Sequence, residues 1–155
     1  QTAELEAGEE GYFLNAAFTV QLTPTLEGAL LKGIPLYFVT SFELVRPRWY
    51  WLDELIAANE HQTKLSYNAL TRQYRLSSGP LYQNLDSLET ALSVLGRVRN
   101  RAVADRGALR KGAEYNAAVR MRLDVSQLPK PLQVSAITSR EWSIESEWFR
   151  WRVSP

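Results

Sequence analysis

Apolar and polar residues alternate along several segments of the chain, and this two-residue period constrains the fold more than any other feature. In residues 114–125 the odd positions are apolar, whereas most even positions are polar or charged. Residues 12–22 follow the same rule with the parity reversed. Because successive side chains of a strand point to opposite faces of its sheet, each segment predicts a strand with one buried face. The chain is therefore expected to be rich in β-structure.

Other segments predict further strands. Residues 34–45 are apolar at both parities, which is typical of a central strand covered on both sides. Residues 63–67 and 74–76 predict the arms of a hairpin that turns near residues 70–72, and residues 48–52 predict an aromatic strand followed by a polar or helical excursion over 53–60. Near the C-terminus two apolar sets have opposite parity, so a bulge near Glu147 is expected to turn both inward.

Helix signals are fewer. Thr23-Pro24 predicts a short helix that stops at Gly33, and Asp86 with Glu89 predicts a second one that stops at Gly96. The basic segment 97–112 is expected to be a loop-rich connection, and residues 1–11 a flexible lead-in. The predicted architecture is a single mainly β (α+β) domain over residues 12–155. It is an antiparallel β-sandwich or open barrel of about seven strands with two or three short helices.

Length and composition fit this prediction. The chain has 155 residues, of which 45% are hydrophobic, enough for one globular core. No run reaches the ~18 apolar residues of a membrane helix, so the chain as given is not expected to span a membrane. It begins with Gln1 rather than Met, from which we expect that an upstream segment such as a signal peptide was removed.

The residue inventory excludes most catalytic schemes. The chain has no Cys, and His61 is its single His, so catalytic triads and thiolate or two-His metal sites lack their residues. The glycines have neither dinucleotide-binding nor Walker spacing. We therefore predict no catalytic residue, no metal site and no cofactor. Carboxylate pairs, Asp53 with Glu54 or the set Glu141, Glu145 and Glu147, leave a hydrolase as a weak alternative.

Two segments combine Arg with aromatic residues. The candidate binding patch consists of Arg46, Arg48, Trp49, Tyr50, Trp51, Trp148, Arg150, Trp151 and Arg152. In one interpretation the Trp side chains cap the core while the Arg side chains form exposed cation–π and ion pairs. In the other, the segments form an exposed surface for a protein partner, a saccharide or single-stranded nucleic acid. A net charge of only +1 argues against nucleic acid.

Several longer segments carry a family resemblance. They are residues 31–38, 46–51, 65–75, 128–131 and 148–151. With these segments the chain resembles a bacterial family of uncharacterised exported proteins, domain-of-unknown-function family 4390, over roughly residues 11–155. The resemblance implies export or membrane proximity, and genes of this family often neighbour a sensor histidine kinase of the nitrogen-regulation type. It implies no activity, so no functional residue carries over.

The expected function is that of a non-enzymatic, periplasmic or envelope-associated binding domain. It presents the Arg/aromatic segments to a protein partner, with an envelope sensor histidine kinase of two-component signalling as the candidate. The alternative is a sandwich that binds a small molecule, lipid or saccharide between its sheet and the helix of Leu26 and Leu30 or that of Leu88 and Leu92. The oligomeric state stays open.

Overall fold

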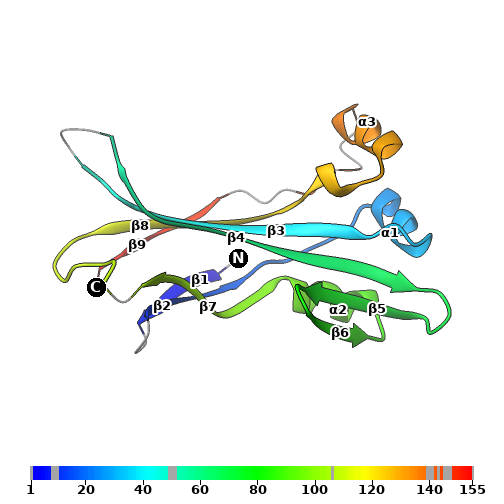
Figure 1. Ribbon diagram of the computed structural model, residues 1–155, viewed down its shortest axis with the longest axis horizontal. Helices are drawn as coiled ribbons and strands as arrows, with labels where there is room; N and C mark the ends of the chain where they lie inside the picture. The colour runs from blue at the N-terminus through cyan, green and yellow to red at the C-terminus, as the bar shows by residue number, and fades with distance from the viewer. Residues whose placement is uncertain are drawn as a thin grey trace.

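Two stacked antiparallel sheets form the protein (Figure 1). The structure, a computed structural model, describes residues 2–7, 11–48, 52–105, 107–138, 142, 144 and 148–154. The smaller sheet has the order β1-β2-β7, with bounds Thr2–Ala7, Gly11–Ala17 and Arg97–Asp105. The larger has the order β6-β5-β4-β3-β8-β9. Its bounds are Leu81–Leu85, Gln73–Ser78, Glu54–Asn68, Leu36–Arg46, Tyr115–Leu123 and Phe149–Val153.

The predicted class, an antiparallel sandwich with short helices, is confirmed, and in the described part of the chain the sheets form no closed barrel. β3 is the central strand that its apolar sequence predicts. It pairs along its length with β4 on one side and with β8 on the other. Leu36, Phe38 and Leu44 on one face are almost fully buried, and Val39 on the other is 4% exposed.

The helices begin and end at the predicted signals. In α1 (Pro24–Leu31) the Thr23 hydroxyl accepts a hydrogen bond from the Leu26 N–H, and Gly33 follows with a φ of 96°. α2 (Leu88–Leu95) is capped by Ser87 rather than by the expected Asp86. After β8 come a 3₁₀ turn, η1 (Val125–Gln127), and α3 (Lys130–Thr138). No helix among the described residues is long and apolar enough to cross a bilayer.

The core lies between the layers. One face of the large sheet packs on the small sheet, where β1 contacts β9 and β4 contacts β7. The part of that face formed by β5 and β6 is covered by α2 (Figure 1). We call this covered side the inner face of the large sheet and the other side its outer face. A hydrogen bond from the Asn59 Nδ2 to the Val103 carbonyl joins the two sheets at 2.7 Å.

Four predictions about individual segments are wrong. The strand expected over residues 12–22 ends at Ala17. Residues 2–7 are not a lead-in but form β1, whose Ala3 and Leu5 pack on the core while Glu4 and Glu6 are exposed. Residues 54–60 are no excursion, because β4 pairs with the whole of β3, and this pairing outweighs their weak β-propensity. Residues 97–105 are no loop but form β7.

The period of β7 is hidden by two irregularities in its pairing with β2. Ala16 lies opposite Val98 whereas Leu14 lies opposite Arg101, so two residues of β2 span three of β7. A second shift follows between Phe13 and Tyr12. Each bulge inserts a residue and inverts the alternation beyond it, so a search for a two-residue period does not find the strand.

β9 confirms that both C-terminal apolar sets face the core. Phe149, Trp151 and Val153 pack against it, and so do Trp142 and Ile144, which have the opposite parity. The predicted bulge near Glu147 lies outside the described residues.

Candidate functional site

The first Arg/aromatic segment is only partly described. Trp49, Tyr50 and Trp51 lie outside the described residues. Arg46 ends β3 and is the register partner of Glu54 in β4. The Arg48 Nε donates a hydrogen bond to the Leu52 carbonyl at 2.8 Å, so this side chain braces the connection from β3 to β4.

The second segment is divided between the two faces of β9. Trp151 lies on the inner face, with its ring centroid 6.3 Å from that of Phe42 and 5.9 Å from that of Phe149. Arg150 and Arg152 alternate with it and are exposed on the outer face. Trp151 therefore belongs to the core, as in the first of the two interpretations above, and shares no surface with the neighbouring Arg side chains.

Trp148 stands instead with the cations of the outer face. The Arg120 guanidinium carbon lies 4.7 Å from the centre of the Trp148 ring, and that of Arg150 lies 5.9 Å from it. Such distances are typical of cation–π contacts. We call Arg120, Trp148, Arg150 and Arg152 the outer-face cluster. Arg120 was missing from the predicted patch, although its polar position in the strand 114–125 was a signal for this face.

The outer face is basic around this cluster. Arg122 on β8 adds a fourth arginine to Arg120, Arg150 and Arg152 on this face. Glu60 lies 3.8 Å from Arg122, and its side chain is 67% exposed, so solvent weakens this pair. Glu43 is separated from Arg150 by Ala118 in the register. The face therefore presents excess positive charge beside a half-buried indole.

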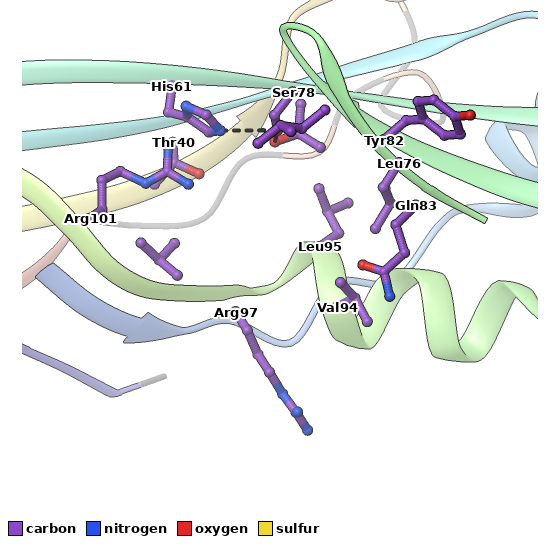
Figure 2. Close-up of a pocket in the computed structure, with 13 residues that line it drawn as sticks. Thr40, His61, Leu76, Ser78, Tyr82, Gln83, Val94, Leu95, Arg97 and Arg101 are labelled. Carbon is purple, nitrogen blue, oxygen red and sulfur yellow. Dashed lines mark hydrogen bonds between the residues drawn. The ribbon is translucent and has the colours of Figure 1, made fainter. Parts of the chain in front are cut away.

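A cavity of about 290 Å³ opens on the other side of the large sheet, and we call it the inter-sheet pocket (Figure 2). It lies between β3, β4, β5 and β6 above and α2 and β7 below. Its polar lining consists of Thr40, His61, Thr63, Ser78, Tyr82, Gln83, Arg97 and Arg101. Its apolar lining consists of Leu76, Leu81, Val94, Leu95 and Val98. In Figure 2 the Arg97 side chain points away from the other labelled residues.

Hydroxyl and imidazole groups form a small network in this pocket. The Ser78 Oγ lies 3.1 Å from the His61 Nε2 and 3.3 Å from the Thr63 Oγ1. Thr40, only 8% exposed, is the register partner of His61 on the inner face. Burial lowers the pKa of His61 below its usual value, and the positive charge of Arg101 lowers it further. Both effects favour the neutral form of the imidazole.

Arg101 is the cation of the pocket. Its Nε is buried and has no hydrogen-bond partner among the described residues, and burial lowers the pKa of the guanidinium. A second cavity, of about 180 Å³, shares Arg101, His61 and Thr40 with the first. Within the described chain no carboxylate forms an ion pair with Arg101; Glu60, which lines the second cavity, is the one near Arg122. Sequence reasoning missed Arg101 because it placed this residue in a loop.

The residues named for a ligand site beside the two helices have different surroundings. Leu26 and Leu30 of α1 are fully buried in the core. A depression of about 680 Å³ is lined by Leu88 and Leu92 of α2 and also by Leu22 and Glu27.

The residues considered for carboxylate and metal chemistry give no assembled site in the described part of the chain. Glu141, Glu145 and Glu147 lie outside it, Asp53 is exposed, and Glu54 lies opposite Arg46. Among the described residues no three His, Asp or Glu side chains are grouped so that they could hold a metal ion.

Comparisons with known proteins place the chain in a family. No curated protein and no solved structure matches it. The family model described as "Domain of unknown function (DUF4390)" matches residues 1–152 of the 155. The family predicted from the sequence segments is thus confirmed, and the chain belongs to the DUF4390 family.

Proposed function

We propose that the protein is a non-enzymatic binding domain that recognises an acidic surface of a protein partner through the outer-face cluster. The observation that carries this proposal is the Trp148 ring beside the Arg120 and Arg150 guanidinium groups on a basic sheet face. Trp and Arg are the residues that most often dominate protein interfaces. Exposed Arg150 and Arg152 would also speed the encounter with an acidic partner.

The partner in this proposal is the extracytoplasmic part of a membrane sensor histidine kinase, and the setting is the periplasm or the envelope of a bacterium. The support for both is what the family resemblance implies about export and about neighbouring kinase genes. A role as an accessory of two-component signalling would need no catalytic residue in this chain.

The first experiment identifies the partner. A photo-cross-linking amino acid replaces Arg152, a member of the outer-face cluster, and is irradiated in intact cells. We expect a cross-link to a sensor histidine kinase. A matched cross-linker at Arg99, which is exposed on β7 of the other sheet, should give none. Cross-links of equal yield from both positions would contradict the assigned face.

The second experiment measures the affinity of the full chain for the purified extracytoplasmic domain of that kinase. Trp148→Ala and Arg150→Glu should each weaken binding about tenfold. Arg99→Glu, a charge reversal at an exposed position elsewhere, should leave binding unchanged. Affinity should also fall as salt is raised, because exposed charges are screened. Wild-type affinity in both cluster variants, with folding verified by circular dichroism, would refute the proposal.

A second candidate function rests on the depression beside α2, whose size is within the range of ligand sites. Leu22, Leu88 and Leu92 give it an apolar wall suited to a lipid or the apolar face of a saccharide. Leu92→Asp would remove such binding, whereas the outer-face variants would not affect it. A screen of lipids and saccharides that raises the melting temperature of neither wild type nor Arg150→Glu would exclude this candidate.

A further inference from the structure

We propose that the inter-sheet pocket is a binding site for a small amphipathic anion, whose acidic group pairs with Arg101 and whose short apolar body lies along α2. This site lies on the inner face of the large sheet and is independent of partner binding at the outer-face cluster. The ligand is defined by its chemistry as one carboxylate or similar singly charged acid group joined to a short hydrocarbon.

The bulges of β7 are what bring Arg101 into the pocket. Leu14, the register partner of Arg101, is 1% exposed and faces the core. Residues directly opposite each other in a ladder share a face of the sheet, so Arg101 faces inward as well. Regular alternation from Val98, which also faces the core, would have put residue 101 on the opposite face. Bulges often re-aim a side chain in this way beside functional sites.

The guanidinium has no counter-ion from the described chain. Arg101 is half-buried, and a charge that is partly removed from water is costly unless it is paired. The same loss of water lowers the pKa of Arg101. The Nε of Arg101 also lacks a hydrogen-bond partner within the described residues. An acid group in the pocket would supply both the counter-ion and the hydrogen-bond acceptor for the Nε, because a guanidinium pairs with a carboxylate through two parallel hydrogen bonds.

The groups around Arg101 indicate that the ligand carries a single negative charge. Thr40 and His61 line both cavities that meet at Arg101. The Ser78 hydroxyl, held by His61 and Thr63, is a further donor in the larger one. Because the pKa of His61 is lowered, the imidazole adds no second positive charge near neutral pH. Arg97 points away from these groups in Figure 2. One cation therefore matches a singly charged ligand.

The apolar residues of the pocket determine the polarity and length of the remainder of the ligand. Leu76 of β5, Leu95 of α2 and Val98 of β7 are buried core residues that line the same pocket. Its volume of about 290 Å³ is slightly below the roughly 300–1,000 Å³ that is usual for ligand sites, so only a small ligand fits. A short hydrocarbon fits this space, whereas a long acyl chain does not.

The test uses octanoate as the probe and the full chain as the protein. Binding is measured by calorimetry and by the NMR signals of His61, which are unambiguous because the chain has a single His. We expect saturable binding of octanoate with shifts of the His61 ring signals. 1-Octanol lacks the charge and acetate lacks the hydrocarbon, so each should bind roughly tenfold more weakly or not at all.

Variants locate the acid group. Arg101→Gln should weaken octanoate binding roughly tenfold or more, and Arg99→Gln, two residues away and exposed, should not. If Arg101→Gln does not fold, the comparison of octanoate with 1-octanol in the wild type still shows whether binding depends on the charge of the ligand. Equal affinity for the two probes, binding of octanoate without a shift at His61, or unchanged binding to folded Arg101→Gln would each overturn the proposal.

Discussion

His61 and Arg101 show how two polar residues can lie within a sandwich although no carboxylate of the described residues forms an ion pair with either of them. They come from different sheets, β4 and β7, and both line the two cavities between the layers. Arg101 keeps its charge at any ordinary pH, since its pKa starts far above neutrality. His61 is the residue of the pair that can release its proton, so the cost of burial and of the neighbouring charge falls on the imidazole.

This arrangement predicts the titration of His61. Its pKa, followed by NMR, should lie below the usual 6.5, chiefly because of burial and partly because of Arg101. Arg101→Gln should raise the pKa without restoring it fully, since burial persists. The free energy of unfolding should depend on pH for the same reason. It is highest above pH 6.5 and falls as the pH drops from 6.5 through the lower pKa of the folded state, because the unfolded chain takes up the proton first.

The measurement is urea unfolding of wild type and His61→Gln between pH 5 and 8. The difference in unfolding free energy between them should decline toward acid pH, since the variant lacks this group. A difference independent of pH, or an Arg101→Gln variant in which the His61 pKa is lowered further, would contradict the assigned causes.

Among the elements, β9 packs on the core with one face and exposes charged residues on the other. Trp151 on its inner face packs with Phe42 and Phe149, whereas Arg150 on its outer face is exposed. We expect Trp151→Ala to lower the unfolding free energy by roughly 2–4 kcal/mol, somewhat less than full burial would give, because the side chain is only half-buried. Arg150→Ala should change it by about 0.5 kcal/mol or less.

Denaturant unfolding of both variants checks this prediction. Similar free energies for the two would mean that Trp151 contributes nothing to the core and that both residues belong to one surface. Because Trp151→Ala removes a core contact, its effect on partner binding cannot be separated from its effect on folding, which is why Trp148 is the better probe of the outer face.

The elements that sequence patterns predicted well are those with uninterrupted periods. β8 keeps its alternation from Tyr115 to Leu123, and α1 has both its capping residue and its terminal glycine. β7 was missed because two bulges break its period, and β1 because small and acidic residues resemble a solvated tail. The pocket was missed for the same reason as β7, since the bulge that hides the strand is also what turns Arg101 inward. Spacing in sequence carries no signal for two polar residues 40 positions apart on different sheets.

The whole molecule depends on how the small sheet is held against the large one. β7 is an edge strand of the order β1-β2-β7, so backbone groups on its free side have no ladder partner. Asn59, on β4 of the other sheet, donates to the Val103 carbonyl at 2.7 Å, and Val103 has no register partner in β2. Val103 itself is 4% exposed, so this side chain satisfies a polar atom at a well-buried position and links the layers beside the pocket.

Loss of this hydrogen bond should therefore destabilise the contact between β4 and β7. Asn59→Ala is expected to lower the unfolding free energy by about 1 kcal/mol, the usual net value of such a bond plus part of the cost of an unpaired carbonyl. Amide exchange should accelerate in β7 while β5 and β6, which α2 covers, stay protected, because local openings follow local contacts. Gln62→Ala, an exposed change on the same strand, serves as the control. Uniform acceleration over both sheets would show instead that the layers open only together, and it would contradict a local role of this hydrogen bond.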